Sequence, residues 1–340
     1  MHHARQLLIL SAVAFAGAGC AIWLNLPVPL LTGPAILATV LSLLGWSLVF
    51  PTRVRDIVFL LTGITIGAGV SRESISALAT WPMAFAAMSL GVVLMMLANR
   101  ALLTQVFRAD RTTALLAATP GHLSFVIASG EEAGADTRKI VVVQSIRLLM
   151  LTLLVPVLAS SFGIDTSLGA AFGSAFHEMS LFQTAGAIVL AAFFIPFFKR
   201  TRVPAPVLLS GMFIGASARL TEIADGGLSH WISWPALAMI GVLIGTRFVG
   251  ITGRELRQYG LAGLLTTTTG ALITLGAAWV AMWIVDMPLV HVLVAFAPGG
   301  LETMAAIGVA IGANPGFVAA AHVLRLLVIS AILPFLLARN

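Results

Sequence analysis

The sequence is short of charged residues and of cysteine. Only 9% of its 340 residues are charged and 59% are hydrophobic, whereas a typical soluble protein carries about 25% charged residues. This composition excludes a disordered chain, a disulfide-rich secreted domain and an ordinary soluble enzyme, because too few polar side chains exist to cover a soluble surface. The sequence therefore predicts a polytopic membrane protein.

The single cysteine, Cys20, excludes a disulfide within the chain. It follows Gly17-Ala18-Gly19, a stretch that resembles the cleavage region of a secretion or lipoprotein signal. The apolar run continues as far as Leu24, however, and is then long enough to cross a membrane. We therefore expect an uncleaved first membrane helix in which Cys20 is a packing residue.

The net charge of +6 comes from 19 basic and 13 acidic residues. In a soluble protein this excess would suggest nucleic-acid binding, but the sequence has no long polar stretch that could form such a domain. Basic residues of membrane proteins collect instead in short cytoplasmic loops. We therefore expect a multi-pass membrane protein, with the lipid bilayer and no nucleic acid as its partner. Assembly into a homo-oligomer is left open.

Apolar segments of about 15–25 residues recur along the chain and are separated by short turns. Twelve segments are candidates for membrane crossings: 7–24, 30–50, 56–70, 81–99, 112–128, 139–160, 185–198, 205–218, 231–249, 260–285, 290–312 and 316–337. A more polar stretch, 161–184, contains Asp165, His177 and Glu178. It indicates a connector or an interfacial helix near the middle of the chain.

The two halves of the chain resemble each other when one is shifted by 178 residues. Pro120-Gly121 then falls on Pro298-Gly299, and Arg147 falls on Arg325. Of the 45 positions from 114 to 158, fourteen are identical in the second half. We therefore divide the chain into a first repeat, a connector and a second repeat, at 1–160, 161–184 and 185–340.

The basic loops exchange places between the two repeats. In the first half they lie at 51–56 and 100–111, whereas in the second half they lie at 199–202 and 247–257, which are not the equivalent positions. Because short loops rich in Lys and Arg face the cytoplasm, the two repeats are expected to face opposite ways across the membrane. With Arg5 near its start, the N-terminus is expected in the cytoplasm.

The number of segments conflicts with this inversion. Six crossings in each half would give parallel repeats, whereas inversion needs an odd number. Either 161–184 contains a further crossing, or one short segment, such as 56–70 or 205–218, does not span. We follow the charges and predict an all-α membrane protein, with about 10–12 transmembrane helices in two inverted repeats that contain interrupted helices.

Each repeat contains a Pro-Gly break inside an apolar segment, namely Thr119-Pro120-Gly121-His122 and Ala297-Pro298-Gly299-Gly300. Proline lacks the N–H that a helix needs, and glycine lets the chain leave helical geometry. Unwound backbone inside a membrane is tolerated only where protein or a water-filled cavity surrounds it. A break duplicated in both repeats indicates a transport site between half-helices, although a pair of kinks or loop ends is the alternative.

Arg147 and Arg325 stand near the middle of strongly apolar segments, where a charge is costly and must face the protein interior. Gln144 and His322, three residues earlier, share their helix faces. In one hypothesis each arginine neutralises the C-terminal end of a half-helix or a buried carboxylate. In the other it contacts an anionic substrate. The polar candidates nearby in sequence are Glu131, Glu132, Asp136, Glu302 and Asn314, the last at the position equivalent to Asp136.

Glu302, followed by Thr303, stands two residues into the segment after the second break. A carboxylate close to a half-helix N-terminus is stabilised by the helix dipole, so capping is one interpretation. Proton exchange, cation binding or substrate contact is the other. Its equivalent in the first half is Ser124, so the two halves differ chemically. The histidines show no metal-ligand spacing, and we expect no metal, cofactor or catalytic group.

The duplicated pattern of Pro-Gly-x-Leu, Gly-Ala-(Asp/Asn) and Arg-Leu-Leu resembles the bacterial AbrB-type integral membrane proteins, which consist of two AbrB duplication units. The resemblance covers roughly residues 25–337. It implies a location in the bacterial inner membrane and an inverted-repeat fold with crossed, interrupted helices, similar to cation–proton antiporters and to bile-acid and auxin carriers. The first unit departs from the pattern, because His122 stands where the second unit has Gly300. Members of the family have been labelled as regulators of gene expression and as ammonia monooxygenases.

Three functions are therefore compared. A secondary transporter of a small, anionic solute explains the inversion, the paired breaks and the buried arginines together. A membrane protein that influences gene expression through a partner would need a soluble output surface, for which 161–184 is small. A membrane oxygenase would need a cluster of metal ligands, which the sequence does not supply. The sequence favours the transporter and does not indicate an enzyme.

Overall fold

The computed structural model describes residues 2–70, 79–121, 123–167, 177–201, 203, 205–224 and 226–338, and these form fourteen α-helices. The first seven are α1 (His2–Trp23), α2 (Pro29–Leu43), α3 (Thr52–Ala68), α5 (Trp81–Gln105), α6 (Arg111–Ala118), α7 (Leu123–Glu132) and α8 (Thr137–Ser161). The second seven are α9 (Leu181–Arg200), α10 (Pro206–Leu220), α11 (His230–Gly245), α12 (Gly253–Val285), α13 (Leu289–Phe296), α14 (Leu301–Ala310) and α15 (Pro315–Ala338). A 3-10 turn, η3 (Thr246–Phe248), follows α11.

The two sets of helices repeat each other in order and in position. The short helices α6 and α13 correspond residue for residue at a shift of 178, and so do α7 and α14. The remaining helices correspond to within one residue at their ends, except that α12 begins six residues before the counterpart of the start of α5 and ends two residues after the counterpart of its end. The shift read from the Pro-Gly and Arg-Leu-Leu patterns is therefore also the shift between equivalent helices.

The helices have the length and the composition that a membrane requires. Seven of them, among the described residues, are long and apolar enough to cross a bilayer: α1, α5, α8, α9, α11 with η3, α12 and α15. Side chains such as Phe182 and Phe193 on α9 are fully apolar and largely exposed, which suits a surface that faces lipid. The predicted all-α polytopic membrane fold is confirmed.

Small residues bring helices of the two halves into backbone contact. Gly63 of α3 packs on the carbonyl group of Leu208 in α10, and Gly67, one turn later, packs on that of Met212. Residue numbers rise together in both helices, so α3 and α10 run parallel. A second pair of helices, α2 and α11, is also in contact. Gly241 of α11 packs on Leu31 of α2 and Gly245 packs on Thr39, so these two helices also run parallel. Consecutive crossings alternate in direction, so α10 runs opposite to α2, its own counterpart.

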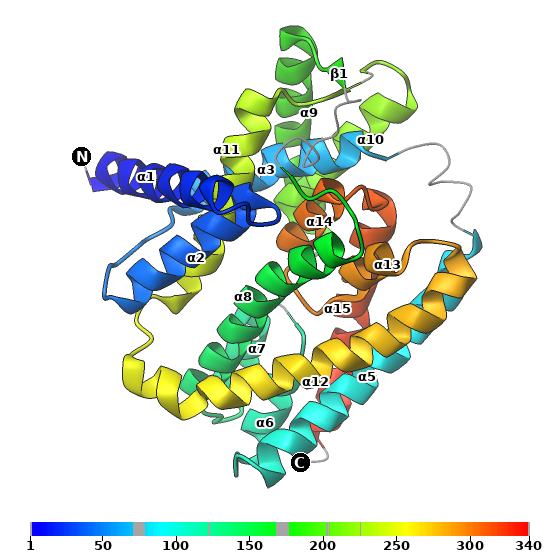
Figure 1. The fold of residues 1–340 in the computed structure, drawn as a ribbon. Helices are drawn as coiled ribbons and strands as arrows, with labels where there is room; N and C mark the ends of the chain where they lie inside the picture. Colours follow the sequence, from blue (N-terminus) through cyan, green and yellow to red (C-terminus); the bar gives the residue numbers. More distant parts are fainter. Residues whose placement is uncertain are drawn as a thin grey trace.

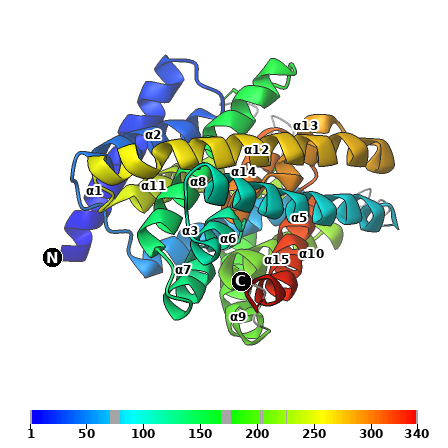
Figure 2. The same ribbon diagram turned by 90° about the horizontal axis from the view of Figure 1, so that it is seen from below.

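The longest counterparts, α5 and α12, lie side by side and run in opposite directions (Figures 1 and 2). A Cβ on Gly91 would lie 3.0 Å from the Cβ of Ala277, and a Cβ on Gly270 would lie 2.9 Å from the sulfur of Met95. Numbers rise along one helix as they fall along the other. Antiparallel counterparts are the arrangement that inverted repeats require.

The interrupted segments are hairpins that return to the side from which they start. The backbone N–H of Asp136, just after α7, donates a 2.8 Å hydrogen bond to Thr113 Oγ1 in the first turn of α6. In the second half, His291 Nε2 in α13 lies 3.1 Å from the carbonyl oxygen of Ile311, just after α14. Each broken pair of half-helices therefore enters the bundle and turns back at its Pro-Gly break.

This geometry corrects the assignment of 112–128 and 290–312 as crossings. In the described structure, five other helices remain in each half: α1, α2, α3, α5 and α8 in the first and their counterparts in the second, of which α2, α3 and α10 are shorter than the seven long candidate spans. Five is odd, as the exchanged basic loops require. A hydropathy pattern cannot distinguish one apolar helix from two half-helices of the same total length, which explains the error.

The connector between the halves is only partly described, because 168–176 lie outside the described residues. α9 begins at Leu181, inside the expected connector. Just before it, β1 (His177–Glu178) pairs in parallel with β2 (Gly226–Gly227). Glu178 Oε1 lies 2.6 Å from His230 Nδ1 at the start of α11, and this hydrogen bond holds the pKa of Glu178 below its usual value.

Candidate functional site

The first break is held by donors from α8. α6 ends at Ala118, and its last carbonyl groups have no partner within the helix. Gln144 Nε2 donates to the carbonyl oxygens of Leu116 and Thr119 at 3.1 and 3.2 Å. The guanidinium of Arg147 donates to Thr119 O at 3.4 Å and to Gln144 Oε1 at 3.2 Å. The two side chains thus cap the C-terminal end of the half-helix.

The second break is held by one side chain, whereas two side chains hold the first. Arg325, only 2% exposed, donates from one terminal nitrogen to Ala297 O and from the other to Gly299 O, the latter at 2.8 Å. His322, the counterpart of Gln144, does not contact these carbonyl groups; its Nδ1 lies 2.9 Å from the carbonyl oxygen of Val318. Ala297 O also accepts a hydrogen bond from the Gly299 N–H, whereas Gly299 O depends on Arg325 among the described residues.

These contacts match the hypothesis in which the arginines neutralise half-helix ends. The C-terminus of a helix carries a partial negative charge, and a guanidinium placed there both hydrogen-bonds the free carbonyl groups and offsets that charge. Arg147 and Arg325 both reach a carbonyl oxygen 28 residues earlier, at equivalent positions. Neither pairs with Glu131 or Glu132, which are exposed. The Nε atoms of both arginines are buried and have no hydrogen-bond partner among the described residues.

The two breaks meet at one small cavity of about 40 Å³. Gly121 of the first break and Gly299 and Gly300 of the second line it, together with Arg325 and Glu302. The space has room for a few water molecules or one small polar group. His122, which the sequence placed in the first break, lies outside the described residues.

Sequence reasoning missed one residue of this cavity. Arg247 was counted among loop charges, but it lies in η3 and lines the cavity, with its Nη2 3.8 Å from Glu302 Oε1. The counterparts of this ion pair are Gly69 and Ser124, which are uncharged. Many charges occur in only one half of the sequence, so a comparison of the repeats does not by itself show that Arg247 and Glu302 meet.

The remaining predicted residues lie away from the cavity lining. Asp136 accepts from the Lys139 N–H and caps the start of α8, and Asn314 accepts from the Phe317 N–H at the equivalent place before α15. Both are at the base of a hairpin. Thr303 is buried on α14 beside Glu302.

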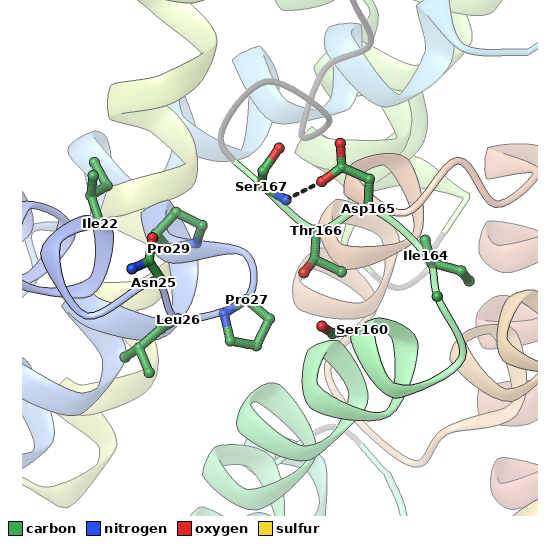
Figure 3. A pocket seen from close by; sticks show the side chains of 11 residues that line it. Ile22, Asn25, Leu26, Pro27, Pro29, Ser160, Ile164, Asp165, Thr166 and Ser167 are labelled. Carbon is green, nitrogen blue, oxygen red and sulfur yellow. Dashed lines mark hydrogen bonds between the residues drawn. The ribbon is translucent and has the colours of Figure 1, made fainter.

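Two further cavities flank the bundle. Pro298 faces an apolar groove of about 230 Å³ between α8 and α12, on the other side of the second break. A more open cavity of about 550 Å³ lies where the loop after α1 meets the end of α8 (Figure 3). There the Ser167 N–H donates to Asp165 Oδ1 at 2.9 Å, which lowers the pKa of Asp165. None of the predicted site residues lines this cavity of about 550 Å³.

The comparisons with known proteins identify one family and two relatives. The family model described as "Transition state regulatory protein AbrB" matches residues 30–339. A protein of Bacillus subtilis (strain 168) named "Uncharacterized protein YhjN" is 25% identical over 300 residues, which cover 81% of this chain and 75% of that protein. "Putative regulator AbrB" of Escherichia coli (strain K12) is 25% identical over 314 residues, 89% of this chain and 87% of its own length. Because the family model covers nearly the whole chain, this membrane protein belongs to the AbrB family.

Proposed function

We propose that the protein is a secondary transporter of a small anionic solute, which binds between the two Pro-Gly breaks. The observation that supports this most strongly is that both breaks line the same cavity, together with Arg247, Arg325 and Glu302. In transporters built from inverted repeats, solutes bind where unwound helices from the two repeats meet near the middle of the bilayer. The cytoplasmic N-terminus and the inner membrane belong to the same proposal.

The charges near the cavity support an anion. Two guanidinium groups and one carboxylate line it among the described residues, and Arg147 lies behind the first break. Guanidinium groups bind carboxylates through paired N–H donors. The half-helix α14 also points its N-terminus at the cavity through Gly300 and Leu301, and the partial positive charge at that end favours an anion.

The names of the relatives suggest another role, regulation. A regulator would act through a partner that recognises an exposed surface, whereas Arg147, Arg325 and Glu302 are buried in the interior of the bundle. We therefore prefer transport, because it gives the buried charges and the unwound backbone a common purpose.

Transport can be measured directly in proteoliposomes. Vesicles loaded with unlabelled acetate, lactate or succinate are expected to take up the same radiolabelled anion at least about 10-fold faster than protein-free vesicles for one of the three. Arg254→Gln, which changes an exposed arginine at the start of α12, serves as the control and should keep the rate. Failure of all three anions with folded protein would contradict the proposal.

A further inference from the structure

We propose that the cavity binds the carboxylate group of the solute on Arg247, and that Glu302 is a tethered carboxylate that occupies this place when no solute is bound. The inference rests on the proposed transport function and specifies its ligand and its competitor. It follows from the geometry of the ion pair, from its position on α14, and from its presence in one repeat only.

The distance between Arg247 and Glu302 is too long for a strong structural salt bridge. Charge-assisted hydrogen bonds between a guanidinium and a carboxylate are about 2.7–2.9 Å long, but Arg247 Nη2 and Glu302 Oε1 are 3.8 Å apart. Neither side chain forms a hydrogen bond with another described side chain, and the side chain of Arg247 is 24% exposed. The donors of this guanidinium are therefore available to a second carboxylate.

The carboxylate of Glu302 folds back toward the start of its own helix. Its two oxygens lie 3.4 and 3.5 Å from the position that a Cβ on Gly300 would take. Gly300 is the N-cap of α14 and offers no side-chain cap, so the N–H groups of the first turn have no partner from that side chain. Glu302 thus places a negative charge where a bound anion would find both a helix N-terminus and Arg247.

A second guanidinium group lines the same cavity. Arg325 is 2% exposed and lines the cavity, yet its Nε is buried with no hydrogen-bond partner among the described residues. Its two terminal nitrogens are occupied by Ala297 O and Gly299 O. A buried donor without a partner is costly, and an anion or its hydrating water in the cavity would reduce that cost.

Only the second repeat contains this arrangement. The counterparts of Arg247 and Glu302 are Gly69 and Ser124. The two hairpins therefore supply similar backbone geometry, whereas the second half alone supplies the guanidinium and the tethered carboxylate. We infer a single carboxylate site in each chain, although the fold contains two breaks.

Calorimetric titration of the full chain in detergent with sodium acetate, at constant ionic strength, tests the competition. Glu302→Gln removes the competitor and is expected to tighten acetate binding at least about 5-fold, whereas Arg247→Gln should weaken it at least about 10-fold. Arg247→Lys, which keeps the charge but loses the fork, should fall between the wild type and Arg247→Gln. If Arg247→Gln does not fold, Arg247→Lys alone tests whether acetate binding depends on the guanidinium group.

The controls change exposed residues of the same types, with Glu131→Gln matched to Glu302 and Arg254→Gln matched to Arg247. Both should bind acetate as the wild type does. Unchanged or weaker acetate binding by Glu302→Gln would overturn the inference. Complete loss of the binding heat in this variant would indicate that Glu302 binds the sodium ion of the titrant. The transport assay is independent: acetate binding with this pattern but no uptake would refute transport and leave the carboxylate site standing.

Discussion

Replacement of Arg325 by methionine is expected to lower the stability of the protein by about 1–3 kcal/mol. The variant removes the donors to Ala297 O and Gly299 O at the second break. Gly299 O then lacks a partner among the described residues, at a cost of about 1–3 kcal/mol, whereas Ala297 O keeps the hydrogen bond from the Gly299 N–H. Relief from burying a charge offsets part of this cost. Thermal unfolding in detergent, followed by tryptophan fluorescence, measures the difference.

The equivalent variant in the first repeat is the matched comparison. Arg147→Met should cost less, because Gln144 keeps hydrogen bonds to Leu116 O and Thr119 O. His322 provides no such substitute in the second repeat. Equal losses for the two variants, or a larger loss for Arg147→Met, would show that the capping contacts do not decide the stability of the breaks.

Replacement of Gly63 by alanine is expected to disrupt the packing of α3 on α10. A Cβ at this position would lie well inside contact distance of the Leu208 carbonyl oxygen and 3.1 Å from the Cα of Gly211. The obstacle is backbone, which cannot rotate away as a side chain can, so we expect a loss of at least about 1–3 kcal/mol. The yield of monodisperse protein and its unfolding temperature report this loss.

Gly276→Ala provides the control, because this glycine lies within α12 with nothing within 4 Å of the added Cβ. Its alanine variant should be neutral, or more stable by about 0.5–1 kcal/mol, since alanine favours helix. If Gly63→Ala were as stable as Gly276→Ala, the close contact between the halves would not be needed for the fold.

The sequence predicted the repeat, the breaks and the buried arginines because each leaves a local mark. A Pro-Gly pair inside an apolar segment identifies an interruption, and Arg147 or Arg325 in such a segment must face inward. The shift of 178 between Arg147 and Arg325 also assigns every helix to its counterpart. These features depend on residue type and spacing, which a single sequence displays.

The hairpins and the ion pair depend on distant contacts. The contact of Asp136 with Thr113 shows that the first broken segment turns back, but hydropathy is the same for a hairpin and for a crossing. Arg247 sits beside true loop residues in sequence, so its charge was assigned to the loop. The sequence offers Asp136 as a partner of the arginines and Asn314 as its equivalent, whereas both residues cap the helices that follow them. Their site role stays a prediction.

Cysteine accessibility tests the inverted hairpin topology most directly. In a Cys20→Ser background, Arg111→Cys and Ala133→Cys probe the two ends of the first hairpin, and Asp286→Cys probes the approach to the second. With a membrane-impermeant maleimide, positions 111 and 133 should react only from the cytoplasmic side and 286 only from outside. Reaction of 111 and 133 from opposite faces, or of 133 and 286 from the same face, would contradict two inverted repeats with re-entrant breaks.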